Sequence, residues 1–467
     1  MLIKALVIIT LCVSGIFAFA GGPGVVGGPA VNSRPPFGID GQPFTWSSSG
    51  LPIVYRVDPG PMSTTSGGSI VIDHNSGVQR VQNMFAVWQS IPTAHISFSN
   101  AGGLLPAGVY TGGDLTTAQQ FNDIMGSCDS GKQSPVIFDA NGKLIASLGL
   151  PPEVIGFNDP CSLDTVNGYI RSSAIVMNGA FQDRVNSSSN FELTANEFDE
   201  SIEHEIGHFL GLDHSQINLD LLLQAVVPCD VDKLAGMPLM FPFAFCQARK
   251  DAGLPALSTD DAAWISTLYP ENFASNYGTI SGQILFRDGL TPAQGVNVIA
   301  RLIDDSATDV DETRRVAVSV VSGYLFTGNP GQNVTATMSQ SFEDNTNGSP
   351  TGSRNPSLIG YYKIAVPPGT YTVEVEAVHY QFAGGSSVGP LDPPVALPQQ
   401  PEFWNEDESP FDYPLQRDSI TVHAGENITD IDVILDDGYS RFDQYEDNGS
   451  LRYPSLFPLT STDRIPA

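Results

Sequence analysis

Basic residues are scarce in this chain. Its 467 residues include 21 Lys and Arg against 51 Asp and Glu, which gives a formal net charge of −30. An acidic surface repels the phosphates of nucleic acids and the headgroups of anionic lipids. We therefore expect neither nucleic acid nor membrane as a partner of the mature chain, although acidity alone names no function.

No long apolar run occurs after the first residues, so no later segment is expected to cross a bilayer. At the start, Lys4 precedes a short apolar run, and Ala18-Phe19-Ala20 is a small-x-small cleavage site. This pattern predicts a signal peptide over residues 1–20. A membrane anchor is the alternative, but the run is short for a span. The mature protein is expected to be secreted (extracellular) or periplasmic.

Cysteine is also rare. Of five cysteines, Cys12 lies in the predicted signal peptide, which leaves Cys128, Cys161, Cys229 and Cys246. An even number of cysteines in an exported chain predicts disulfides. We favour Cys128–Cys161 and Cys229–Cys246, because each bond closes a local loop; the other pairings and free buried thiols are the alternatives. The spacing does not resemble a Cys-rich zinc site.

The first part of the mature chain contains several segments that differ in composition and periodicity. Residues 21–43 are rich in Gly and Pro without apolar periodicity, and are expected to form a flexible leader. Apolar residues spaced three and four apart predict a helix over 74–89. A long loop-rich stretch follows residue 98 and leads to a predicted hairpin over 136–145 with an Asn-Gly turn. A calcium site at Asp139 and Asn141 is a second interpretation of that turn.

The best-marked element is a helix predicted to begin near Ala195. Thr194 is a good N-cap, and Glu197 completes a capping box. Gly211 supplies a residue able to adopt positive φ, which ends the helix. Its apolar stripe consists of Phe198, Ile202, Ile206 and Phe209. A second helix is predicted from Ser258, where Asp260 and Asp261 are interpreted as capping and structural residues rather than catalytic ones.

After residue 270 the composition changes to strand and turn signals without helical periodicity. Short predicted strands separated by turns indicate an all-β sandwich over 276–438, with long loops at 304–357 and 380–415. A polar tail over 439–467 completes the chain.

Residues 204–214 read HEIGHFLGLDH, and this segment carries the chemistry. His204 and His208 are four residues apart, so on a helix they project from one face. Gly211 turns the chain so that His214 can return to the same point. Three neutral nitrogens leave the fourth zinc position open for water, and Glu205 can take the proton of that water. Three unrelated histidines are the alternative, which the complete pattern disfavours.

HEIGHFLGLDH resembles the metzincin signature, and Ser215 directly after it resembles the matrixin branch. Leu239-Met240-Phe241-Pro242 is similar to the matrixin Met-turn, with Met237 as a poorer candidate. The segment from Leu257 to Pro270 is similar to the C-terminal helix of that domain. The resemblance covers residues 44–272. It implies an α+β zincin fold with a twisted sheet above the cleft, helices below, and endopeptidase action on an extended peptide that adds to the sheet edge.

Some family features are missing. No cysteine-switch motif precedes the domain, residues 21–43 are too short for a folded propeptide, and further metal-binding histidines are not recognisable. The 276–438 region resembles carboxypeptidase-regulatory-like sandwiches, chiefly in GTISGQILFRDG and YYKIAVPPGTYTVEVEA. Such modules usually support a neighbouring domain or tether it to a surface or substrate. Catalysis is therefore expected to lie wholly within 44–272.

These observations predict a secreted zinc-dependent metalloendopeptidase with one catalytic Zn²⁺, the ligands His204, His208 and His214, and the general base Glu205. Its partner would be a protein or peptide substrate. An adhesion or matrix-binding protein with a vestigial protease domain is the alternative from another class, but a vestigial site has no need of the base. A zinc amidase using the same motif is a third possibility.

Overall fold

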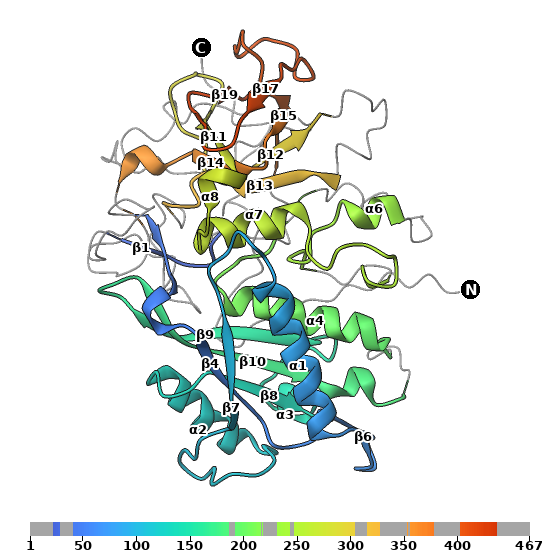
Figure 1. Cartoon of the computed structure of the whole chain (residues 1–467). Helices are drawn as coiled ribbons and strands as arrows, with labels where there is room; N and C mark the ends of the chain where they lie inside the picture. Colours follow the sequence, from blue (N-terminus) through green and yellow to red (C-terminus); the bar gives the residue numbers. More distant parts are fainter. Residues whose placement is uncertain are drawn as a thin grey trace, which may run out of the picture.

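The computed structural model describes most of the chain between Gly22 and Asp436. Figure 1 shows a lower part in which helices surround a sheet, and an upper part made mainly of strands, with α7 (Thr259–Leu268) at the junction. Within the described residues, no helix is both long and apolar enough to span a membrane. The described residues are 22–28, 41–185, 192–215, 217, 231–242, 247–303, 315–326, 353, 355–377 and 402–436.

The lower part contains a six-stranded sheet in the order β3-β10-β8-β4-β7, with β9 also paired to β10. All pairings are parallel except that of β9, which is antiparallel to β10. Strand β8 is buried along its whole length, as expected for a strand inside a parallel sheet. The strands are β3 (Thr45–Trp46), β4 (Ile53–Val57), β7 (Phe98–Gly103), β8 (Pro135–Asp139), β9 (Gly156–Asp164) and β10 (Tyr169–Asn178).

Helices cover both faces of this sheet, because alternate residues of each strand point to opposite sides. Val136 and Phe138 share a core with α1 (His74–Gln89) and α4 (Ala195–Phe209), whereas Ile137 packs with α2 (Ala118–Asp129) and α3 (Lys143–Ser147). The predicted helix over 74–89 is confirmed. Helix α2 replaces part of the stretch expected to be loop, and its capping box at Thr117 and Gln120 is the local signal for it.

The hairpin predicted over 136–145 is wrong in its second half. Strand β8 is followed by α3, because the Asp139 carboxylate accepts a hydrogen bond from the Ile145 backbone N–H at 2.7 Å and holds the chain in a helical turn. Leu144 and Ile145 are thereby buried against α2. Asn141 accepts a bond from the Lys143 N–H, so local backbone contacts account for both side chains of the calcium interpretation.

The upper part consists of two sheets that share one apolar core. Pro367 and Pro368 connect β14 in one sheet to β15 in the other. One sheet contains β11 (Gly278–Leu285), β14 (Tyr361–Val366), β18 (Asn427–Ile428) and β19 (Val433–Ile434). The other contains β12 (Val296–Leu302), β13 (Ala317–Val321), β15 (Gly369–Ala377), β16 (Glu402–Phe403) and β17 (Ile420–Val422).

Part of the expected flexible leader is bound to the folded chain. Strand β1 (Val26–Gly27) pairs with β2 (Gln42–Pro43). The Gly24 N–H donates to the Gly211 carbonyl at 2.8 Å, and the Asp213 N–H donates to the Gly22 carbonyl at 2.9 Å. A segment with few side chains can lie this close to a neighbouring backbone. Residues 22–28 are therefore a docked strand rather than a free leader.

One predicted disulfide is present. Cys128 at the end of α2 is bonded to Cys161 in β9, with an S–S distance of 2.09 Å. Cys229 and Cys246 lie outside the described residues, as do the predicted signal peptide over 1–20 and the polar tail over 439–467. The remaining short elements are η1 (Ser48–Gly50), β5 (Ser63–Thr64), β6 (Ile70–Ile72), η2 (Gly179–Gln182), α6 (Val231–Ala235), α8 (Phe273–Asn276) and η3 (Pro356–Leu358).

Candidate metal centre

Helix α4 presents two of the three predicted ligands. Its N-terminus carries the predicted capping box, in which Thr194 Oγ accepts from the Glu197 N–H and Glu197 bonds back to the Thr194 N–H. One side of the helix is anchored in the core by fully buried apolar residues, which are Phe198, Ile202, Ile206 and Phe209. His204 and His208 lie on another side and remain partly exposed. The apolar stripe therefore fixes the rotation of the helix, and with it the direction of both imidazoles.

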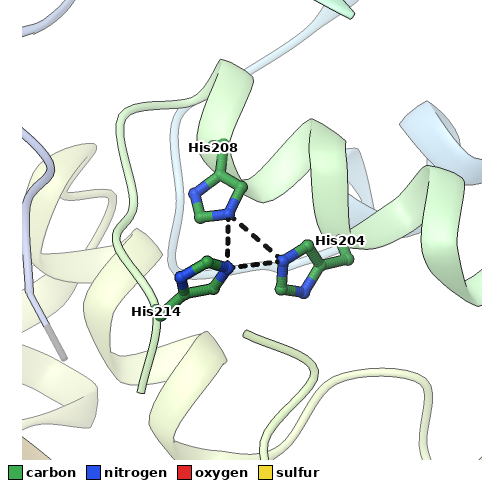
Figure 2. A group of neighbouring side chains, drawn as sticks. All are labelled: His204, His208 and His214. Carbon is green, nitrogen blue, oxygen red and sulfur yellow. Dashed lines mark hydrogen bonds between the residues drawn. The ribbon is translucent and has the colours of Figure 1, made fainter. Parts of the chain in front are cut away.

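Gly211 brings the third histidine back to the helix. Its φ of +88° is a conformation that side chains rarely adopt, so the helix ends there. The Leu212 N–H returns to the Gly207 carbonyl at 3.0 Å, which closes the last turn. His214 then lies buried opposite His204 and His208 (Figure 2).

The three imidazoles converge through their Nε2 atoms. The Nε2–Nε2 distances are 3.0 Å for His204–His214, 3.1 Å for His208–His204 and 3.0 Å for His208–His214 (Figure 2). A tetrahedral zinc ion with Zn–N bonds of about 2.0–2.1 Å spaces its nitrogens by roughly 3.3 Å. The observed triangle is close to that size.

The outer nitrogens determine which tautomer is present. The Nδ1 of His204 is 2.7 Å from the Leu239 carbonyl, and the Nδ1 of His208 is 2.9 Å from the Leu212 carbonyl. A carbonyl only accepts, so each Nδ1 carries the proton and each Nε2 presents a bare lone pair. Such backbone acceptors behind a ligating histidine are typical of metal sites.

Desolvation by the surrounding protein favours the neutral form of these imidazoles. Desolvation, and then the neighbouring His204, lower the pKa of His208 to about 3. Desolvation also lowers the pKa of His204, and together with the two neighbouring rings it places that of His214 well below its usual range. Neutral imidazole is the form that binds a metal. Bare lone pairs at 3 Å repel one another, and a cation between them removes that repulsion, so the donor set fits a zinc ion.

Glu205 directly follows the first predicted ligand, His204, on helix α4. It is 3 % exposed, and its Oε2 has no hydrogen-bond partner among the described residues. Burial raises its pKa to about 8. A buried carboxyl with a spare oxygen is suited to exchange a proton with a nearby water or substrate.

The predicted turn at Met240 lies directly against α4. The Phe241 N–H donates to the Pro238 carbonyl at 3.2 Å, so Leu239 and Met240 are the central residues of a turn. A methyl group on Gly207 would come within 2.2 Å of Met240 Sδ, which places Met240 against the helix between the two ligand positions. Met237 is also buried but precedes this turn.

Asp261 connects this turn to α7. Besides capping its own helix through Ser258, its carboxylate accepts from the N–H groups of Leu239 at 2.9 Å and Met240 at 3.0 Å. The capping interpretation of Asp261 is confirmed, but it omitted this second role. The adjacent doublet of acids at a helix start gives no sequence signal for a contact with a turn some twenty residues earlier in the chain.

Of the predicted site residues, the structure brings together His204, His208 and His214, with Glu205 and Met240 on or against the same helix. Sequence reasoning missed Arg249, whose buried guanidinium binds the carbonyls of Leu234, Met237 and Pro255 behind the turn.

Comparison with known proteins adds little. No protein-family model and no curated protein sequence matches the chain. One solved structure, described as the GM1 bound form of the ECX AB5 holotoxin, is similar at 15 % identity over 42 % of this chain and 62 % of that chain, with a TM-score of 0.21. The match thus spans less than two thirds of that chain, and a TM-score this low carries no argument about fold or function.

Proposed function

We propose that this protein is a secreted zinc-dependent metalloendopeptidase of the metzincin type. The observation that carries the proposal is the convergence of three Nε2 atoms within 3.1 Å, together with the buried and unpartnered Glu205 on the same helix. A zinc ion bound there would act as a Lewis acid on a peptide carbonyl and would lower the pKa of water. The ligands would be His204, His208 and His214.

Glu205 would act as the general base and then as the general acid. Burial alone raises the pKa of Glu205 to about 8, and a cation held by the three imidazoles would lower it, so that the ionised carboxylate could accept a proton from the attacking water and release it again near neutral pH. The same carboxyl would pass that proton to the departing amine when the peptide bond breaks. One residue thus serves both proton transfers.

The edge of the sheet offers a place for the substrate. Strand β9 is antiparallel to β10, and in the described part of the chain β10 is its one strand partner. Helix α4 packs against β9, so this edge runs beside the metal centre. An extended peptide would add to it as a further strand, held by main-chain hydrogen bonds.

Four further features support the metzincin assignment and export. The sheet carries a single antiparallel strand at its edge, α4 packs against that strand, and the Met240 turn lies against the helix. The Cys128–Cys161 disulfide is the kind of bond that persists in oxidising compartments outside the cytosol.

The test compares two carboxyl variants of α4. Glu205→Gln keeps all three imidazoles, so the purified protein should retain about one zinc per chain. Its peptidase activity should fall about a hundredfold to ten-thousandfold, since general-base loss has that cost. Glu203→Gln is the matched control, because Glu203 is equally buried on the same helix but two positions away, on another side. It should keep activity within a few-fold.

His208→Ala supplies the complementary outcome, since removing a ligand should lose both zinc and activity. Metal content by elemental analysis and cleavage of a peptide library give the two readouts, with polysaccharide and small amide substrates assayed in parallel. A wild-type protein that binds zinc but cleaves no peptide would favour the adhesion or amidase alternatives. Full activity in Glu205→Gln would refute the mechanism.

A further inference from the structure

The upper part of the molecule reaches the metal centre through one edge strand. Strand β13 pairs with β12 on one side and is the last strand of its sheet. On its other side, the backbone groups of Ser319 are bound by α7. The Ser319 N–H donates to Asp260 Oδ1 at 2.7 Å, and the Ser319 carbonyl accepts from Trp264 Nε1 at 2.7 Å. An edge that would otherwise expose unpaired groups is thus covered by two side chains of the lower part.

The same serine contacts the residue that follows the third ligand. Ser319 Oγ is 3.2 Å from Ser215 Oγ, and Ser215 also bonds the Asp260 carboxylate. The Ser215 N–H donates to the Met240 carbonyl at 2.8 Å. Ser215 is therefore held at three points, by the Met240 turn, by α7 and by the edge of the upper part. All three hydrogen-bonding residues, Ser215, Asp260 and Ser319, are buried.

The contact continues beyond Ser215. Ile217 is buried in a small cluster with Ile299 of β12 and Ala317 of β13. The chain leaving the third ligand is thus packed on the β-rich part of the molecule rather than on the sheet of the lower part.

His214 depends on such support more than the other ligands do. His204 and His208 lie on α4, whose apolar stripe fixes them. His214 lies in an irregular segment after the helix end, so its position is determined by what holds its neighbours. Residues that orient a metal ligand from behind typically change metal affinity by about 10- to 100-fold when removed.

We propose that the C-terminal β-module is a structural part of the metal centre, with Asp260 and Ser319 as positioning residues that hold His214 through Ser215. The proposal rests on the proposed function in that the triad must hold a metal ion. It replaces the expectation that the site is complete within residues 44–272, with the module serving only as a support or tether.

The test measures metal binding by the full-length chain, independently of peptidase activity. Zinc affinity is determined by competition with a chromophoric chelator, and the Co²⁺-loaded protein reports ligand geometry through its visible absorption. Asp260→Ala should weaken zinc binding about 10- to 100-fold and change the Co²⁺ spectrum. Asp260→Asn keeps an acceptor oxygen of the same shape, so it should restore most of the affinity.

A second variant covers the case in which Asp260→Ala fails to fold. The double variant Ser215→Ala/Ser319→Ala removes the two hydroxyls but keeps both hydrogen bonds between the Ser319 backbone and α7. This variant should also release zinc faster. Ser281→Ala is the matched control. Ser281 is a buried serine of β11, in the sheet of the module that does not contain β13, and its hydroxyl donates to the Ile428 carbonyl. Its replacement should leave metal binding unchanged.

Two negative results would overturn different proposals. If the wild-type chain binds zinc and the folded Asp260→Ala or double variant matches it in affinity and Co²⁺ spectrum, this proposal alone is overturned. If the wild-type chain binds no zinc, the proposed function is overturned together with it.

Discussion

Gly207 lies at a close approach between α4 and the Met240 turn. A methyl group at this position would lie 2.2 Å from Met240 Sδ and 3.0 Å from the Trp88 ring. Both neighbours are buried, and the turn is held by Asp261, so neither can move away cheaply. The glycine is therefore required by packing, because its φ does not lie in the left-handed region.

We predict that Gly207→Ala destabilises the protein and weakens metal binding. Overpacking of a core typically costs about 1–3 kcal/mol, which outweighs the roughly 1 kcal/mol that alanine gains over glycine inside a helix. Gly126→Ala is the matched control, since Gly126 lies inside α2 with no atom within 4 Å of the added methyl group. Urea unfolding in the presence of chelator should show opposite shifts for the two variants. Equal shifts would mean that the contact with Met240 does not matter.

Asp260 and Asp261 show which roles of a residue can be predicted from the sequence and which cannot. Asp260 and Asp261 both fit a helix start, and Asp261 does complete a capping box. However, Asp261 also holds the turn at Leu239 and Met240, and Asp260 binds the N–H of Ser319. The capping role was predictable because it is local. The other contacts join residues about 20 and 59 positions apart, for which the sequence contains no short-range signal.

Among the elements, the segment that carries the Met240 turn depends on Arg249. Its guanidinium binds the carbonyls of Leu234, Met237 and Pro255, while its backbone N–H donates to Glu200 on α4. Burial lowers the pKa of Arg249, and the nearby charges of Asp261, Glu200 and Glu203 oppose that shift. The arginine thus connects α4, which carries His204 and His208, to the segment that carries the Met240 turn.

We predict that Arg249→Met lowers the free energy of unfolding by about 3–5 kcal/mol, because it leaves the carbonyls of Leu234, Met237 and Pro255 without their donor, at about 1–3 kcal/mol for each group that stays buried. Arg171→Met is the control, since Arg171 is bonded to Asp164 but its side chain is 59 % exposed. An exposed pair contributes about 0–1 kcal/mol. Chemical denaturation of both variants measures the difference. Comparable losses would contradict the role given to burial.

Helices and strands, like single residues, were predictable where the signal lies within the segment itself and not where it comes from a distant part of the chain. Helices α1, α4 and α7 were predicted because their periodicity and capping residues are contained in each segment. Helix α3 was predicted as a strand, because the cap that makes it a helix comes from Asp139 at the end of the preceding strand. The docking of Gly24 on Gly211 was missed altogether, since nothing in a Gly- and Pro-rich segment reveals its distant partner.

At the scale of the whole molecule, several buried acids have raised pKa values. Desolvation raises the pKa of Asp58 and Glu200 to about 7 and that of Glu402 to about 8, in addition to Glu205. An acid whose pKa is raised by folding binds its proton more tightly in the folded state than in the unfolded state. Stability is then complete below the unfolded pKa and decreases as the pH rises toward the folded pKa.

We therefore predict that the metal-free protein loses stability between about pH 4.5 and pH 8. The urea midpoint measured with chelator should fall across this range. The net charge of −30 acts in the same direction through self-repulsion, so the series should be repeated in about 1 M NaCl, where surface charges are screened over roughly 3 Å. The decrease should persist in salt, because burial causes it. A midpoint that rises with pH would show that paired surface carboxylates dominate instead.

The docked N-terminal segment and the bond from Ser319 to Asp260 have a consequence for the order of assembly. The surroundings of His214 are drawn from residues near 22, near 240 and near 319. A chain that emerges from its N-terminus contains all three histidines long before it contains β13. During that interval His214 lacks its support, so the group of three histidines is not yet held in place. For the proposed peptidase, activity would therefore appear only after most of the polypeptide has been synthesised, and this timing would restrain premature proteolysis.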